Sequence, residues 1–245
     1  MQVVKEPIVE IEHLKKSFGN NKVLDDINLK ILKGENLVVL GRSGTGKSVL
    51  IKCLVRLLES DQGKMLVFGE NVNELNEDRL NKLRERIGFI FQSSALYDSM
   101  TVRENLEFPL RLLPMEMKKE MKSRVHEALE HVGLSEAIDK MPSELSGGMR
   151  KRIGLARALM LRPEVILYDE PTTGLDPITA KEISHLIMDI QKEYNATSVI
   201  ITHDISCAKI TANRMVMLKD GILAAEGNYD DLVKSEDKEI RKFFD

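Results

Sequence analysis

The chain has 245 residues, of which 42% are hydrophobic, enough to bury the core of one large domain. Charged residues make up 31%, yet the formal net charge is only -3, so the composition favours no nucleic-acid partner. Apolar runs such as the one at 37–40 fall far short of the roughly 18 residues that a membrane crossing needs. The first residues also lack the apolar core of a secretion signal. We therefore expect a soluble, cytosolic chain with a single domain over residues 1–245.

The first third of the chain predicts a small sheet followed by a strand–loop–helix unit. Short β-rich runs at 8–14 and 27–31 flank the turn residues 19–21 and favour an antiparallel pairing. An apolar strand at 37–40 then leads through a glycine-rich loop into a helix that extends to Leu57. Another apolar strand follows at 87–91.

The rest of the chain alternates helices and strands. Residues from about 93 to 160 have helical periodicity, with one apolar stripe before Gly133 that consists of Met117, Met121, Val125, Leu129 and Val132. Apolar strands at 165–169, 197–202 and 214–218 surround a helix at 178–194. This alternation predicts an α/β fold with a mostly parallel central sheet. The fold would also contain the N-terminal antiparallel β subdomain and an inserted α-helical subdomain at about 93–160.

The segment GRSGTGKS at 41–48 fits the phosphate-binding pattern G-x-x-x-x-G-K-[ST] between a strand and a helix. Its glycines let backbone N–H groups surround phosphate oxygens, Lys47 neutralises their charge, and the Ser48 hydroxyl can bind Mg²⁺. The predicted loop consists of Gly41, Arg42, Ser43, Gly44, Thr45, Gly46, Lys47 and Ser48. The alternative is a glycine turn with a solvated lysine.

Two adjacent carboxylates end the apolar strand VILYDE. Asp169 is placed to hold Mg²⁺ and Glu170 to act as general base toward an attacking water. The end of a parallel strand beside a phosphate loop is where phosphate chemistry gathers in open sheets. The alternative is an exposed acidic turn before Pro171.

A second phosphate-ready helix start occurs in SELSGGMRKR at 143–152. Ser146, Gly147 and Gly148 supply a hydroxyl and bare backbone there, although a single triphosphate does not need two such cradles in one subunit. The pattern therefore predicts a dimer in which each copy completes the other's site. The alternative is a capped helix whose first-turn cations, in MRKR, are solvated.

Taken together, the ordered motifs resemble the ATP-binding subunit of an ATP-binding cassette (ABC) transporter over essentially the whole chain. LSGGM at 145–149 stands between GRSGTGKS and VILYDEPTTGLD, with Gln92 after the strand at 87–91 and His203 in IITHD. The resemblance implies the ABC ATPase form of the P-loop NTPase fold, ATP and Mg²⁺ as cofactors, and ATP hydrolysis by a homodimer.

The resemblance also implies roles for single residues. Phe18 would stack on adenine, Gln92 would touch Mg²⁺ or water, His203 would contact the γ-phosphate and orient Glu170, and Asp176 would belong to a loop that reaches across the dimer. The alternatives are a core phenylalanine, a polar loop, a structural histidine and a helix cap, respectively.

Three further features are similar to the ATPases of Mla/Mce phospholipid transporters. These are the segment QSSALYDSMTVRENLEFPLR at 92–111, Met149 in place of the family's usual glutamine, and DPIT at 176–179. The similarity implies a cytoplasmic ATPase dimer under two permease subunits at the inner membrane. It also implies a periplasmic Mce-domain lipid-binding protein and a small cytoplasmic regulator as partners.

Other classes remain open or fit less well. Amino-acid importers, lipoprotein-release systems and drug exporters share every catalytic motif. A non-transport ABC protein acting on DNA or ribosomes fits poorly, because the chain has one cassette and no basic field. A P-loop kinase would leave LSGGM unexplained.

The remaining chemistry-bearing residues suggest no metal centre. Cys53 and Cys207 lie apart in apolar surroundings and are expected to be buried thiols, while His126 and His131 have the wrong spacing for a shared metal. Phe243 and Phe244 could dock on a partner or pack on the chain itself.

Overall fold

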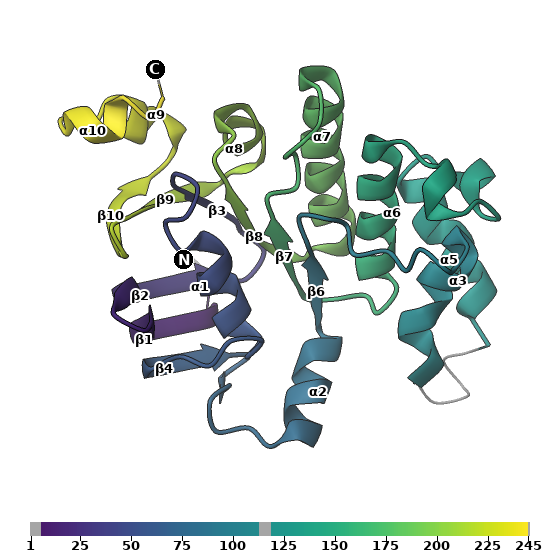
Figure 1. The fold of residues 1–245 in the computed structure, drawn as a ribbon, viewed down its shortest axis with the longest axis horizontal. Helices are drawn as coiled ribbons and strands as arrows, with labels where there is room; N and C mark the ends of the chain where they lie inside the picture. Colours follow the sequence, from purple (N-terminus) through teal and green to yellow (C-terminus); the bar gives the residue numbers. More distant parts are fainter. Residues whose placement is uncertain (1–5, 113–118, 245) are drawn as a thin grey trace, which may run out of the picture.

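The computed structural model describes residues 6–112 and 119–244, and they form two sheets and two groups of helices (Figure 1). The first sheet is antiparallel with the strand order β2-β1-β4-β5. Its strands are β1 (Pro7–Phe18), β2 (Asn21–Leu32), β4 (Gln62–Val67) and β5 (Glu70–Asn71). The expected pairing of the first two strands is confirmed, but both are longer than predicted, and β4 and β5 were not predicted.

The second sheet is the central one, with the order β10-β9-β3-β8-β7-β6. Strands β9, β3, β8, β7 and β6 run parallel, and β10 pairs antiparallel at one edge. The strands are β3 (Asn36–Leu40), β6 (Ile87–Ile90), β7 (Val165–Asp169), β8 (Thr197–Thr202), β9 (Arg214–Lys219) and β10 (Ile222–Gly227). The predicted mostly parallel sheet is confirmed.

Alternate residues of β3 pack into two different cores, one on each face of the central sheet. Val38 and Leu40 belong to a core with the helices that follow β6. Leu37 and Val39 belong to a core with the antiparallel sheet and the helix after the phosphate-binding loop. Because side chains alternate along a strand, a strand buried on both faces is apolar throughout. This explains why the central strands were easy to predict.

The helices cover both faces of the central sheet, and those between β6 and β7 extend to one side of it (Figure 1). They are α1 (Lys47–Leu54), α2 (Glu77–Glu85), α3 (Val102–Glu107), α5 (Met121–His131), α6 (Gly147–Leu159), α7 (Pro177–Tyr194), α8 (Ile205–Thr211), α9 (Tyr229–Val233) and α10 (Lys238–Arg241). Short 3-10 turns, η1 (Phe108–Leu112), η2 (Ser135–Ala137) and η3 (Pro142–Glu144), connect several of them. Helix α1 ends at Leu54, so the expectation that it extends to Leu57 is wrong.

The predicted apolar stripe accounts for the packing of α5. Val125, Leu129 and Val132 are buried, and Met121 packs against the same core; Met117 lies outside the described residues. None of the described helices has both the length and the apolar character that a bilayer crossing requires. Both predicted buried thiols are confirmed, and burial raises the pKa of Cys53 and of Cys207 to about 11.

Candidate functional site

The glycine-rich loop joins the end of β3 to the start of α1, as the motif requires. Gly46 precedes the helix with φ 100 and ψ 4, a left-handed conformation that glycine adopts without steric cost. A Cβ atom at this position would lie 2.9 Å from the Val23 carbonyl oxygen. The close approach of the loop to the strand therefore requires glycine at position 46.

Lys47 begins α1 and is buried, with only 5% of its surface exposed. Its ammonium donates to the carbonyl oxygens of Gly41 at 2.8 Å and Arg42 at 3.0 Å. It also lies 3.2 Å from a carboxylate oxygen of Glu170. The alternative of a turn with a solvated lysine is wrong.

Asp169, the last residue of β7, lies beside Ser48, which follows Lys47 in the phosphate-binding motif. Its carboxylate accepts a hydrogen bond of 2.9 Å from the Ser48 hydroxyl. Burial raises the pKa of Asp169, an effect that the Ser48 hydrogen bond and the nearby Lys52 oppose. Asp169 and Glu170 are both buried, so the alternative of an exposed acidic turn is also wrong.

Glu170 is held from three sides. One carboxylate oxygen pairs with Lys47, while the other lies 2.8 Å from Nδ1 of His203 and accepts a 3.2 Å hydrogen bond from the Thr173 hydroxyl. Its backbone has φ 51, an uncommon conformation for a residue other than glycine that persists only where surrounding contacts hold it. Thr173 was missed in the sequence, although its position three residues after Glu170 in DEPTTG was a usable signal.

A cleft of about 410 Å³ brings together eight of the seventeen predicted site residues. It is lined by Val23, Ser43, Gly44, Gly46, Lys47, Ser48, Val49, Gln92, Glu170, Thr173 and His203. Residues from β3–α1, the segment after β6, β7 and the end of β8 thus meet at the carboxyl edge of the parallel strands, where ligands of such sheets bind. The lining does not include Phe18, Ser146, Gly147, Gly148 or Asp176. It also lacks Asp169, which contacts the cleft residue Ser48, and Gly41, Arg42 and Thr45, which line a separate pocket.

Ser146 caps α6, because its side-chain oxygen accepts a 3.2 Å hydrogen bond from the Met149 N–H. Gly148 has a packing reason to be glycine: a Cβ there would lie 2.7 Å from the Thr179 methyl carbon, whereas a Cβ at Gly147 would meet nothing nearer than 3.8 Å. Met149 packs against the core that Val38 and Leu40 form with the helices after β6. These contacts explain Gly148 and Met149 within one subunit, but they leave Gly147 without a packing reason.

Lys151 was missed, and the alternative in which the first-turn cations of MRKR are solvated is wrong for it. Only 6% of Lys151 is exposed. Its ammonium donates to the Gln92 carbonyl oxygen at 2.5 Å and to the Glu170 carbonyl oxygen at 3.3 Å. Burial lowers the pKa of Lys151, and the carboxylates of Asp169 and Glu170 oppose that shift.

Asp176 and Phe18 are both exposed. Asp176 caps α7 by accepting from the N–H groups of Ile178 and Thr179, both at 3.1 Å. Its hydrogen bonds, above all that from the Thr179 hydroxyl, lower its pKa. Phe18 ends β1 with 49% of its surface exposed, and the Lys16 ammonium lies 5.3 Å from the ring centroid. Phe18 is therefore not a core residue.

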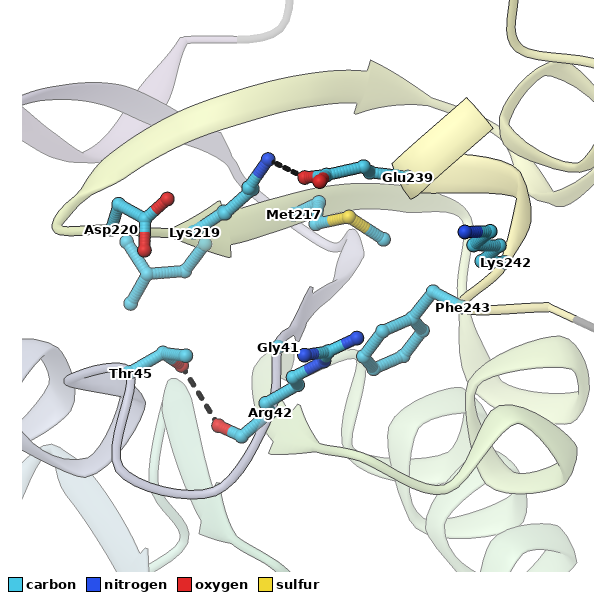
Figure 2. A pocket seen from close by; sticks show the side chains of 10 residues that line it. Gly41, Arg42, Thr45, Met217, Lys219, Asp220, Glu239, Lys242 and Phe243 are labelled. Atoms are coloured by element: carbon cyan, nitrogen blue, oxygen red, sulfur yellow. Dashed lines mark hydrogen bonds and ion pairs between the residues drawn. The ribbon is translucent and has the colours of Figure 1, made fainter. Parts of the chain in front are cut away.

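The C-terminal helices meet the outer side of the phosphate-binding loop. Figure 2 shows a second pocket, of about 200 Å³, in which Phe243 faces Arg42 of the loop, with Lys219 and Glu239 in an ion pair at the rim. Phe244 packs edge-on against Tyr229 at 5.7 Å between ring centroids. In this structure both phenylalanines pack on their own chain.

Comparison with known proteins decides the family. The model for the family described as ABC transporter matches residues 24–173. The chain belongs to the ABC transporter family. It is an ATP-binding and ATP-hydrolysing subunit of an ABC transporter.

Two curated relatives differ in their named cargo. This ABC ATPase is 42% identical, over 96% of its length and 68% of the relative's, to a probable ribonucleotide transport ATP-binding protein mkl of Mycobacterium leprae. It is 40% identical, over 91% of its length and 61% of the relative's, to the methionine import ATP-binding protein MetN of Rhizobium johnstonii. The chain thus spans about two thirds of the length of these relatives.

A solved structure supports both fold and activity. The ATP-binding cassette MJ0796, in a dimeric post-hydrolysis state bound to ADP and Pi, superposes with a TM-score of 0.81 at 32% identity. The match covers 90% of this ABC ATPase and 98% of that chain. The α/β fold with its antiparallel sheet and helical insertion is therefore confirmed as the ABC ATPase fold.

Proposed function

We propose that this ABC ATPase hydrolyses ATP at two composite sites of a homodimer. The observation that carries the proposal is the division of its motifs: one cleft gathers Lys47, Gln92, Glu170 and His203, while Ser146–Gly148 lies outside that cleft at the start of α6. A second phosphate-ready helix start is useful only to another copy's nucleotide. The γ-phosphate bound by one subunit would be enclosed by Ser146, Gly147 and Gly148 of its partner.

The donor atoms beside Lys47 suit Mg²⁺. The Ser48 hydroxyl and the Asp169 carboxylate already lie within 2.9 Å of each other, and Gln92 lines the same cleft. Magnesium at nucleotide sites is usually held by one or two carboxylates together with the phosphates. Held by these residues, the ion would supply positive charge beside the β- and γ-phosphates of ATP.

Glu170 is the proposed general base. His203 and the Thr173 hydroxyl contact the same carboxylate oxygen, so they orient the carboxylate before a water molecule attacks the γ-phosphate. Lys47 can exchange its contact with Glu170 for a phosphate oxygen when ATP binds. That exchange frees the carboxylate to accept the proton of the attacking water.

Phe18 and Asp176 complete the proposed site from the outside. The exposed ring of Phe18 offers a face on which adenine can stack. Asp176 holds the start of α7 next to Gly148 through Thr179. In the dimer this region would face the partner's nucleotide.

The shared-site model is tested by mixing two inactive variants. Ser146→Arg should block the partner's site, and Lys47→Ala should disable its own, while the exposed Ser143→Arg serves as a control. A heterodimer of the first two variants contains one intact composite site, so it should regain ATP hydrolysis. Activity in either pure variant, or none in the heterodimer, would contradict the model.

A permease can dock beside Gln92. A shallow apolar cleft of about 150 Å³, lined by Val55, Leu57, Arg84, Ile87 and Phe89, lies along the strand that leads to Gln92. Leu57 of this cleft and Tyr97, five residues after Gln92 in the sequence, are exposed large hydrophobic side chains, and exposed apolar patches are typical of interaction surfaces. We place the ATPase at the cytoplasmic face of the inner membrane, bound through permease subunits.

For cargo we propose phospholipid moved between inner membrane and outer envelope, with a periplasmic Mce-domain protein and a small cytoplasmic regulator as further partners. The support is the resemblance in residues 92–111, Met149 and residues 176–179. Amino-acid import is the second candidate, favoured by the likeness to MetN. Purification with the native membrane partners, followed by mass spectrometry of bound molecules, decides between them: a bound amino acid and no phospholipid would overturn the first.

A further inference from the structure

One face of α6 holds the segment that follows β6. Lys151, Gly154 and Arg157 are spaced by three residues and so share a helix face. Lys151 donates to the Gln92 carbonyl oxygen at 2.5 Å, and Arg157 donates to the Ala95 carbonyl oxygen at 2.7 Å. Between them, a Cβ at Gly154 would lie 3.2 Å from the Cβ of Ser94. The helix and the segment 92–95 are therefore in close contact over two turns.

The backbone held by this face adopts uncommon conformations. Ser94 and Ala95 have φ 64 and φ 47, and Glu170 on the neighbouring strand end has φ 51. Left-handed conformations of residues other than glycine cost on the order of 1–3 kcal/mol each and persist only where surrounding contacts hold them. The carbonyl oxygens of Gln92 and Glu170 both receive such a contact from the Lys151 ammonium.

We propose that Lys151 is a positioning residue that ties α6 to Gln92 and Glu170 of its own subunit and so sets the geometry of water attack there. This inference rests on the composite-site function proposed above. It adds that the helix whose start serves the partner's nucleotide also braces the catalytic residues of its own subunit. The two sites of the dimer are thereby joined through the six residues from Ser146, the N-cap of α6, to Lys151.

The energetic basis is the buried ammonium. A hydrogen bond from a charged donor is stronger than a neutral one, and removing it deprives the carbonyl oxygens of Gln92 and Glu170 of a shared donor. Because Lys151 touches backbone oxygens and not the phosphate-binding loop, its loss should misplace Gln92 and Glu170 without weakening ATP binding. A displacement of about 1 Å at reacting groups can cost on the order of a hundredfold in rate.

The first test compares homodimers. Lys151→Met keeps the length of the side chain and removes the ammonium, and we expect turnover to fall by roughly tenfold or more while ATP affinity changes by less than about twofold. Lys151→Arg should restore most of the turnover, because a guanidinium can also donate to both carbonyls. Unchanged turnover in Lys151→Met, or a parallel loss of ATP affinity, would overturn the proposal.

Arg124→Met is the matched control for loss of a buried cation. Arg124 is also largely buried and donates to a backbone carbonyl, that of Met160 at 3.3 Å, but it lies on α5 away from Gln92 and Glu170. Its turnover should stay close to that of the wild type. A fall equal to that of Lys151→Met would mean that any buried cation of the helical region has this effect, which would also overturn the proposal.

The second test separates the subunit's own site from its partner's. In the first heterodimer, one subunit carries Lys151→Met and its partner carries Glu170→Gln. The one remaining Glu170 then belongs to the subunit that lacks Lys151. In the second heterodimer, one subunit carries both changes and its partner is wild type. The one remaining Glu170 then belongs to the subunit that keeps Lys151, and the altered subunit supplies the start of α6 to that site. We expect the first to be at least about tenfold slower than the second; the reverse order or equal rates would refute positioning within one subunit.

Failure of the proposed site can be told apart from failure of this inference. A Glu170→Gln homodimer as active as the wild type would refute the role of Glu170. The homodimer comparison of Lys151→Met with Lys151→Arg and Arg124→Met does not use that variant and would still decide the role of Lys151.

Discussion

Replacement of Glu170 by Gln should have opposite effects on the free protein and on its complex with ATP. The change removes the charge of a buried carboxylate that lies 3.2 Å from the Lys47 ammonium and 2.8 Å from His203. At an effective dielectric constant of about 20, a pair at this separation attracts by about 5 kcal/mol. Much of that is offset by the cost of burying both charges, and Lys47 keeps its contacts with Gly41 and Arg42. We therefore expect the free protein to lose about 1–2 kcal/mol of unfolding free energy.

ATP should reverse this loss. In the wild type the ATP phosphates compete with the Glu170 carboxylate for Lys47, and in the variant they do not. The variant should therefore gain more thermal stability from ATP than the wild type does. Without a general base, turnover should fall by roughly 10²–10⁴, and the ATP-bound dimer should accumulate. Thermal unfolding with and without ATP, steady-state hydrolysis and size-exclusion chromatography measure these effects. Hydrolysis within about tenfold of the wild type would refute the assignment of Glu170 as the base.

Two further variants probe the charge and the packing of the site. Because burial raises the pKa of Asp169, the folded state binds a proton more readily than the unfolded state, so the ionised carboxylate costs stability as pH rises through that raised pKa. Without nucleotide or Mg²⁺, Asp169→Asn should therefore raise the temperature midpoint of unfolding at pH 7 by a few degrees, equivalent to about 1 kcal/mol. The gain should disappear near pH 3. A lower midpoint for the variant at pH 7 would contradict the cost of this charge. Gly148→Ala should destabilise the protein by about 1–3 kcal/mol, because its Cβ would lie 2.7 Å from the Thr179 methyl carbon, whose side chain is held by a 2.6 Å hydrogen bond to Asp176. Gly147→Ala, with 3.8 Å to its nearest neighbour, is the matched control, and equal losses in urea unfolding would show that the contact is relieved without cost.

The central strands and the phosphate-binding loop could be predicted because their signals are local. The expected strands at 165–169 and 197–202 coincide with β7 and β8, since a strand covered on both faces is a continuous apolar run. By contrast, β4 has only Met65 and Val67 buried, and it is a strand because β1 offers a pairing edge. A pairing edge supplied by another part of the chain leaves little trace in a short polar segment.

The same division holds for the site. The sequence by itself determined the ATP chemistry, because a phosphate-binding loop and a strand ending in Asp169 and Glu170 depend on residue types at fixed local spacing. Only the tertiary structure decided which neighbours hold these groups. Lys151 looks like the cations on either side of it in the sequence, yet packing places its ammonium on carbonyl oxygens 59 and 19 residues away. Such contacts depend on how α6 packs against β6 and β7, and no local pattern encodes that distance.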